Sequence, residues 1–268
     1  MPMLIGIPLD ANSSYLRGAA AAPAKIREAL HSDAWNSWTE LGVDLSVAAA
    51  FADAGDLPLK DSSKTVEQDF SEIRRAIAAI LEKGDRPVSL GGDHSITYPI
   101  LQAVGRKFPD LTIVHFDAHP DLYDQFEGNR FSHACPFARI MEERLASRLV
   151  QIGIRTLNRH QREQAQKFDA EIVPMAELPA YGRAAIRGPV YISFDLDVLD
   201  PAFAPGVSHR EPGGMSVREA IAHLHAIRGN IVGADVVEYN PTQDVAGATA
   251  MVAAKIVKEI LGKMISPA

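Results

Sequence analysis

The sequence predicts an α/β protein of three layers, in which helices cover both faces of a largely parallel central sheet. Two observations predict it. Short apolar runs typical of strands alternate along the chain with longer segments of helical periodicity, which is the order of repeated βαβ units. Several of the strand-like runs are apolar along most of their length, as expected for strands covered on both faces. Without an internal repeat or a long flexible linker, residues 1–268 are expected to form one domain.

Each expected strand is a short apolar run bounded by polar or turn-forming residues. The expected strands are Met3–Ile7, Pro87–Leu90, Leu111–Phe116, Leu149–Ile154, Val190–Phe194 and Ile231–Val237. The first of them lies in the segment Met1 to Asp10, which has no basic leader and no small-residue cleavage site. That segment is therefore interpreted as a strand and not as a signal peptide.

The expected helices follow the 3.6-residue apolar period. They are Ala24–Leu30, Val66–Lys83, Ile96–Phe108, Ala138–Arg148, Arg159–Lys167, Val217–Ile227 and Ala250–Met264. Ser216 and Glu219 have capping-box spacing, and Gly84 and Gly229 are interpreted as helix stops. The Pro- and Gly-rich stretch Asp200–Gly214 follows an acidic cluster directly, so we expect an ordered active-site loop there and not a simple surface connection.

The composition excludes several classes of protein. With 47 % hydrophobic and 23 % charged residues, the chain can bury a core and stay soluble. A net charge of −7 argues against nucleic acid as a partner, and no apolar run is long enough to predict a membrane-spanning helix. Cys135, the only cysteine, permits no intrachain disulfide, which fits a reducing compartment and predicts a cytoplasmic location.

Three short clusters contain six side chains that commonly bind metal ions. The six are His94, Asp117, His119, Asp121, Asp195 and Asp197. Each cluster follows an expected strand, and ligands of parallel sheets gather at the carboxyl ends of the strands. Two-residue spacing places the members of the second and third clusters on one side of an extended chain. We therefore expect the clusters to converge.

Crowded carboxylates repel one another unless a cation lies between them. A single Asp or His is more often a surface or capping residue, and one Asp-x-Asp is a weak signal. Three such clusters at three strand ends are poorly explained in that way. Oxygen ligands with a minority of imidazoles suit manganese among the divalent ions. The sequence thus predicts a two-metal enzyme.

The motifs also resemble those of the ureohydrolase family, which comprises arginases, agmatinases and related guanidino-group hydrolases. The matching motifs are Gly91–Ser95, Asp117–Asp121, Ser193–Pro201 and Glu238–Pro241. The resemblance covers nearly the whole chain. Segments Tyr123–Asn129 and Pro205–Gly214 are most similar to plant-type arginases. What the resemblance implies is an arginase-like fold assembled as a homotrimer or homohexamer.

Two bridged manganese ions per chain are implied by the same resemblance. The implied ligands of the first ion are His94, Asp117, Asp121 and Asp195, and those of the second are Asp117, His119, Asp195 and Asp197. Asp117 and Asp195 would bridge the two ions. The charges agree with this assignment, because four carboxylates balance two divalent cations.

The expected reaction is hydrolysis of a guanidino group to urea and an amine. Two metal ions lower the pKa of a shared water toward ~7, which supplies a hydroxide to attack the guanidinium carbon. By resemblance, Asp121 carries the proton to the leaving nitrogen and Glu238 pairs with the guanidinium. His133 resembles the family's proton shuttle. A surface acid and a structural histidine are the plainer interpretations of Glu238 and His133.

The rest of the substrate is less well determined. Tyr123 stands where animal arginases have an Asn that holds the amino-acid head group, and Asn158 stands near an acid of those enzymes. The residues expected to line the tail pocket are Tyr123, Asn129, Asn158, His209 and Glu211. L-Arginine is slightly favoured over agmatine because of the plant-type similarity. Other guanidino acids and formiminoglutamate remain alternatives.

Two other classes of function also fit parts of the pattern. A mononuclear zinc amide hydrolase of the deacetylase type would not need four Asp and two His together. A non-catalytic homologue acting as a subunit or regulator would be expected to lack a ligand, and all six are present. Metal content and urea release distinguish these alternatives from the binuclear enzyme.

Overall fold

The computed structural model describes residues 1–59, 65–180 and 186–266. These residues form one sheet of eight strands in the order β2-β1-β3-β8-β7-β4-β5-β6, and every neighbouring pair is parallel. The strands are β1 Pro2–Gly6, β2 Ala52–Asp56, β3 Arg86–Leu90, β4 Thr112–Phe116, β5 Arg148–Ile154, β6 Glu171–Pro174, β7 Pro189–Asp195 and β8 Asn230–Val237. The predicted α/β class and parallel sheet are confirmed.

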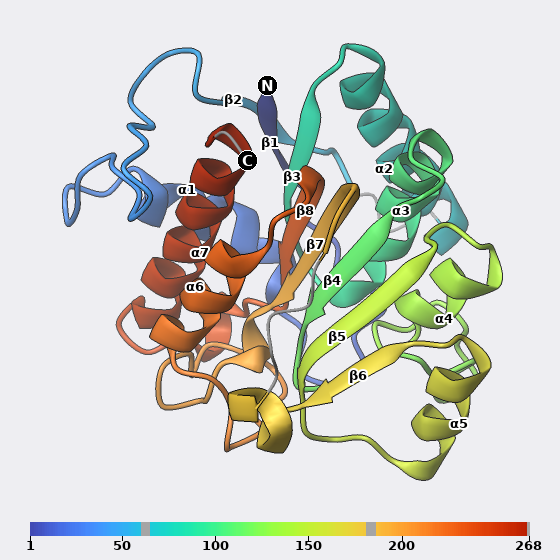
Figure 1. Ribbon diagram of the computed structural model, residues 1–268. Coiled ribbons are helices and arrows are strands. Elements are labelled where there is room, and N and C mark those ends of the chain that lie inside the picture. The colour runs from blue at the N-terminus through green and yellow to red at the C-terminus, as the bar shows by residue number, and fades with distance from the viewer. Residues whose placement is uncertain (60–64, 181–185, 267–268) are drawn as a thin grey trace.

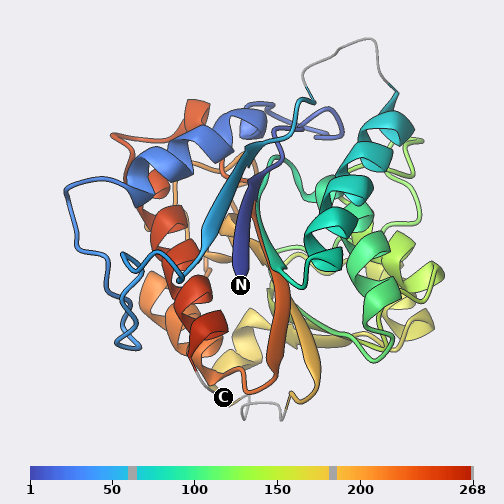
Figure 2. The same ribbon diagram turned by 90° about the horizontal axis from the view of Figure 1, so that it is seen from above.

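Helices cover both faces of the sheet (Figures 1 and 2). On one face lie α1 Ala22–Leu30, α6 Val217–Ala226 and α7 Ala248–Ile265. On the other lie α2 Val66–Glu82, α3 Thr97–Lys107, α4 Pro136–Glu142 and α5 Arg159–Lys167. None of the helices among the described residues combines the length and the apolarity needed to cross a bilayer.

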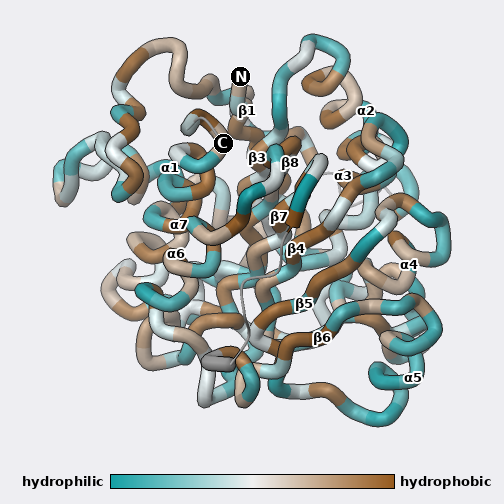
Figure 3. The backbone as a smooth tube through the Cα atoms, in the orientation of Figure 1, coloured by the Kyte–Doolittle hydropathy of each residue, from teal (hydrophilic) through white to brown (hydrophobic). Residues whose placement is uncertain are grey.

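Successive strand residues point to opposite faces, which explains why the central strands are largely apolar on both faces. In β4, Ile113 packs into the core beneath α2 and α3, whereas Val114 packs into the core beneath α6 and α7. Leu149 and Val150 divide in the same way in β5. Figure 3 shows the resulting hydrophobic colour along the central strands.

All six predicted strands are confirmed, but β2 and β6 were not predicted. Both are edge strands that pair with only one neighbour. The sequence of β2, Ala-Asp-Ala-Gly-Asp, is mostly exposed, and β6 has only four residues. Neither needs an apolar run, because an edge strand buries little of its surface.

One predicted helix is too long. The helix expected over Ala138–Arg148 begins at Pro136 and ends at Glu142, and Arg148 already belongs to β5. Leu145 and Ala146 are buried in the connecting loop, so their apolar side chains resemble a helical face without forming one. This loop packs against α3 at Gly105, where a Cβ would lie 2.1 Å from the Leu145 carbonyl oxygen.

The predicted helix signals give mixed results. The Ser216–Glu219 capping box is present in both directions, and Gly84 follows α2 with φ of +81°. Gly229 is not a helix stop, because α6 ends at Ala226 and Gly229 has no left-handed φ. Its lack of a side chain serves the close approach of Val190, whose Cγ2 would lie 2.3 Å from a Cβ at this position.

The Asp200–Gly214 stretch is an ordered loop beside the carboxyl ends of the strands, as predicted. Isolated bridges join Val207 to Tyr239, and Leu199 to Met215 just beyond its two ends. Arg155 also holds it, donating to the backbone oxygens of Asp197 at 2.6 Å and Glu211 at 2.7 Å. The loop is thereby fixed next to the last acidic cluster.

Candidate active site

The three predicted clusters converge. His94 follows β3, Asp117 follows β4, and Asp195 is the last residue of β7. His94 Nδ1 lies 3.2 Å from Asp117 Oδ2 and 3.1 Å from Asp195 Oδ2. Asp121 Oδ2 is also 3.1 Å from this nitrogen. Three carboxylates that lie far from His94 in the sequence therefore surround one nitrogen of its imidazole.

A second group lies beside the first and shares Asp117 with it. His119 Nδ1 is 2.9 Å from Asp197 Oδ2 and 3.3 Å from Asp117 Oδ1. Asp117 therefore turns one oxygen toward His94 and the other toward His119. Such a carboxylate between two donor groups is suited to bridge two ions, as the family resemblance implies.

The hydrogen bonds behind His94 leave its Nδ1 free to bind a cation. His94 Nε2 lies 3.0 Å from Ser193 Oγ, and the Ser193 hydroxyl donates to Asp235 Oδ1 at 2.7 Å. Nε2 is then the protonated nitrogen, which places the lone pair on Nδ1. Nδ1 is buried and has no hydrogen-bond partner among the residues that the structure describes, although three carboxylates surround it. The residues present therefore fit a metal ion.

Proton affinities within the cluster point to the same conclusion. Burial raises the pKa of Asp195 well above its usual range, and Asp197 and Asp117 add to the effect. Burial, with Asp117 next, raises the pKa of Asp197 to about 6. Burial lowers the pKa of His94, but Asp117, Asp121 and Asp195 outweigh it and raise that pKa well above the usual value. Without cations the cluster would hold protons in their place.

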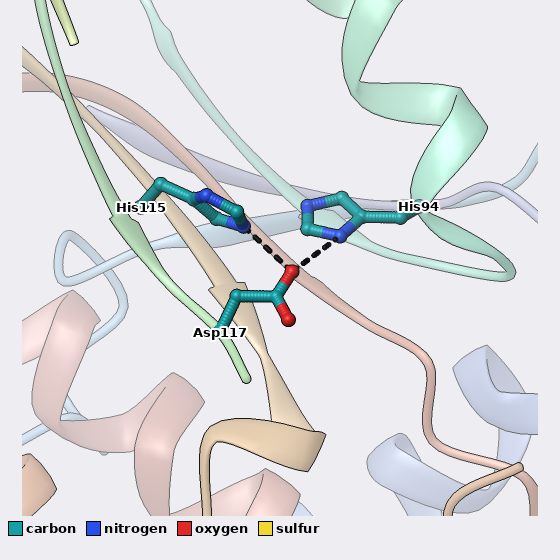
Figure 4. Close-up of side chains that lie close together, drawn as sticks. All are labelled: His94, His115 and Asp117. Carbon is teal, nitrogen blue, oxygen red and sulfur yellow. Dashed lines mark hydrogen bonds and ion pairs between the residues drawn. The ribbon is translucent and has the colours of Figure 1, made fainter. Parts of the chain in front are cut away.

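His115 is a site residue that the sequence interpretation missed. It lies close enough to His94 and Asp117 to form a potential metal-binding group with them (Figure 4). However, the Gln151 amide nitrogen lies 2.8 Å from His115 Nδ1, so Nε2 carries the proton and donates to Asp117 Oδ2 at 2.7 Å. His115 thus orients Asp117. The sequence feature that could have identified His115 is an imidazole within a buried, mostly apolar strand.

A cavity of about 170 Å³ opens beside the cluster. The lining residues are Ser14, His119, Asp121, Tyr123, Phe126, His133, Ala134, Thr156, Gln161, Asp195, Asp197, His209 and Glu238. Both the acidic cluster and the predicted guanidinium and shuttle residues therefore face one space. Ser14, Phe126, Ala134, Thr156 and Gln161 were not predicted, because their residue types carry no metal or catalytic signal.

Glu238 follows β8 and is buried, with a left-handed backbone at φ of +63°. Its Oε1 accepts the His94 backbone N–H at 2.8 Å and lies 2.9 Å from His133 Nδ1. Among the residues that the structure describes, no hydrogen-bond partner meets Oε2. Asp121 has a left-handed backbone as well, at φ of +51°. Non-glycine residues in this conformation are strained and concentrate at functional sites.

His133 is the imidazole next to Glu238. Burial lowers its pKa, but Glu238, with Asp93 and Asp121 behind it, outweighs burial and raises the pKa to about 9. The ring of His209 lies 5.2 Å from the His133 ring and limits its rotation. Glu238 itself keeps a lowered pKa, because the charge and hydrogen bond of His133 outweigh its burial. Glu238 and His133 therefore form an ion pair.

Two of the five predicted tail residues, Tyr123 and His209, line the cavity. The other three do not, because each lies in a segment that is held by local hydrogen bonds away from the cavity. Asn158 caps α5, with its Oδ1 accepting from Gln161 N at 3.0 Å, and its amide donates to the Tyr123 hydroxyl. Asn129 closes a turn, and the Glu211 backbone oxygen accepts from Arg155.

Known proteins similar to this chain agree with this arrangement of the sheet and the site. Residues 2–262 match the sequence model of the arginase family. Arginase 1, mitochondrial, of Arabidopsis thaliana is 47 % identical, over 97 % of this chain and 80 % of its own. Agmatinase of Bacillus subtilis (strain 168) is 36 % identical, over 97 % of this chain and 90 % of its own. The solved arginase of Medicago truncatula superposes with a TM-score of 0.94 at 44 % identity, covering 98 % of this chain and 87 % of that one.

These relatives correct one prediction. The predicted cytoplasmic location is wrong, because plant relatives at 46–47 % identity are named mitochondrial or chloroplastic enzymes. The prediction rested on a single cysteine, Cys135. One thiol argues only against disulfides and does not distinguish one reducing compartment from another.

The match extends over nearly the whole chain and agrees with the parallel sheet and with the convergence of histidines and aspartates at its carboxyl edge. The chain belongs to the arginase family.

Proposed function

We propose that this protein is a binuclear manganese ureohydrolase that hydrolyses L-arginine to urea and L-ornithine. The observation that carries the proposal is the position of Glu238 in the same small cavity as the His–Asp cluster. A guanidinium held by this carboxylate places its carbon next to the cluster that would activate water. The relatives named arginase support L-arginine as the substrate.

The proposed metal ligands are those that the structure gathers around His94 and His119. They are His94, Asp117, His119, Asp121, Asp195 and Asp197. When bound, the metal pair supplies a water that ionises near neutral pH. Four carboxylates and two imidazoles suit manganese, and they neutralise two divalent charges within a buried site.

The protein's own groups divide the remaining work. Glu238 binds the guanidinium through Oε2, since Oε1 already accepts from His94 N and His133. Water adds to the guanidinium carbon, and the bond from that carbon to the side-chain nitrogen breaks. Asp121 takes the proton of the attacking water and delivers it to that nitrogen, so urea and a free amine leave. His133 exchanges the further proton between the pocket and solvent.

Agmatine is the second candidate substrate, and one observation favours it. None of the cavity-lining residues in the described part of the chain is Lys or Arg. The side-chain donors that this lining offers to a substrate carboxylate are therefore imidazole, hydroxyl and amide groups. Agmatine lacks that carboxylate, and relatives named agmatinase are 33–36 % identical to this chain.

A urea-release assay tests the proposal. The purified protein, loaded with manganese, is compared on L-arginine, agmatine, guanidinobutyrate and formiminoglutamate, the last by formamide release. We expect the highest kcat/KM for L-arginine, two manganese ions per chain, and loss of activity with a chelator that added manganese reverses. Absence of product from every substrate would indicate a non-catalytic homologue, and one zinc per chain with amide hydrolysis would indicate the deacetylase-type enzyme.

A homotrimer or homohexamer is proposed on the family resemblance alone. Sedimentation equilibrium of the metal-loaded protein measures it directly, since the chain mass is 29.0 kDa. A monomer would contradict it without affecting the catalytic proposal.

A further inference from the structure

A short chain of hydrogen bonds runs from Glu238 through His133 to a serine near the N-terminus. His133 Nδ1 lies 2.9 Å from Glu238 Oε1, and His133 Nε2 lies 2.8 Å from Ser14 Oγ. All three side chains line the cavity. Ser14 is 119 residues away from His133 in the sequence, so folding alone brings them together.

The donors and acceptors of this chain can be assigned from its ends. An ionised Glu238 can only accept, so His133 Nδ1 carries a proton. Nε2 of the neutral ring then needs a donor, and the Ser14 hydroxyl is the group in place. When Nε2 gains a proton, the same hydroxyl can accept from it. A hydroxyl is both donor and acceptor, so it suits both protonation states of the ring.

The loop that carries Ser14 is tied to the rest of the site by its backbone. Asn12 N donates to Asp93 Oδ2 at 3.0 Å, and His133 N donates to Asn12 O at 3.1 Å. Asp93 is fully buried and also accepts a longer bond, of 3.3 Å, from the Ser13 hydroxyl. The backbone and the ring of His133 therefore both contact the segment around Ser14, which leaves the hydroxyl little freedom.

We infer that Ser14 is a positioning residue for His133: its hydroxyl fixes the orientation of the imidazole by holding Nε2, and it exchanges donor and acceptor roles with that nitrogen during proton transfer. Among the described residues, the Ser14 hydroxyl is hydrogen-bonded to His133 and not to a proposed metal ligand. The kinetic consequences rest on the proposed function, whereas the hydrogen bond itself does not.

Replacement of Ser14 tests the inference. We expect Ser14→Ala to lower kcat for urea release about 10-fold while KM for L-arginine changes less than about 2-fold, because one hydrogen bond to the proton-carrying ring is lost. Ser14→Thr, which keeps the hydroxyl, should recover most of kcat. Ser13→Ala is the matched control, since it removes the neighbouring hydroxyl of the same loop without touching His133.

A readout independent of turnover keeps the inference separate from the proposed function. In nitrogen NMR spectra of the histidine-labelled protein loaded with diamagnetic zinc, the His133 Nε2 resonance should move in Ser14→Ala and stay in place in Ser13→Ala. An unmoved Nε2 resonance would overturn the inference, whatever the activity. A raised KM at constant kcat would also overturn it, because Ser14 would then be a substrate contact. If the wild-type protein releases no urea but Nε2 moves, the proposed function fails and the hydrogen bond stands.

Discussion

The carboxylate of Glu238 is the group whose replacement most directly tests the assignment of the guanidinium site. In Glu238→Gln the amide oxygen can occupy the place of Oε1 and keep the His94 backbone and His133 as donors. The amide nitrogen then replaces Oε2. It carries no charge, and its own N–H groups oppose those of a guanidinium. The change therefore removes substrate recognition and leaves the surrounding bonds in place.

The expected loss of kcat/KM follows from the burial of the site, since Glu238 is 4 % exposed. Removing one partner of a buried, hydrogen-bonded charge pair costs about 2–5 kcal/mol. With a factor of ten for each ~1.4 kcal/mol, kcat/KM for L-arginine should fall roughly 30- to 4,000-fold. The stability of the folded state should change little, because neutralising Glu238 relieves its repulsion with Asp93 while it removes the charge that is paired with His133.

Steady-state urea release, metal content and thermal unfolding measure the three parts of this prediction. Glu127→Gln is the matched control, because Glu127 also has a left-handed backbone, at φ of +50°, but is exposed and does not line the cavity. Loss of metal from Glu238→Gln would show that this residue supports the metal site. A kcat/KM within about 3-fold of wild type would show that the guanidinium binds elsewhere.

Two further variants extend the tests. Asp195→Ala should lose bound manganese and nearly all urea release, because Asp195 is a proposed bridging ligand; full activity with undiminished metal would remove it from the site. Hydrogen bonds from Arg218 and, less strongly, Lys255 lower the pKa of Glu40 to about 2 from the usual 4.5. A depressed folded pKa stabilises the protein above pH 4.5 and less as pH falls toward 2. The difference in unfolding free energy between wild type and Glu40→Gln, from urea titrations of metal-free protein, should therefore shrink over that range; a constant difference would contradict the assignment.

The part of the fold that could be predicted from the sequence is the part that is buried. The central strands are largely apolar on both faces, so a mostly apolar run such as Leu111–Phe116 reveals them. The exposed edge strand Ala52–Asp56 is subject to no such demand, and its hydrogen bonds to β1 involve backbone groups common to every sequence. Leu145 illustrates the opposite error, a helix predicted too long. Its apolar side chain fits a helical pattern, but the residue is buried in a loop.

The proposed metal ligands were recognisable because each lies in a cluster whose charges require an explanation. Their supporting groups were not, because a serine, a glutamine or a strand histidine has many ordinary uses. Ser14 and Gln151 gain their roles only when folding places them against His133 and His115, far away in the sequence. Asn158 illustrates the opposite case, in which a polar residue near the site serves the helix that begins beside it.

The left-handed backbone conformations of Asp121 and Glu238 reduce the stability of the folded chain. Such a conformation costs a non-glycine residue about 1–3 kcal/mol, and glycine would adopt it with little strain. Favourable interactions in the surrounding sheet must therefore offset the backbone strain at these two positions. Engineering for heat resistance that follows backbone preference alone would select glycine at both positions and remove the proposed proton carrier and the proposed guanidinium ligand together. In this molecule the most attractive stabilising substitutions are the ones to leave untouched.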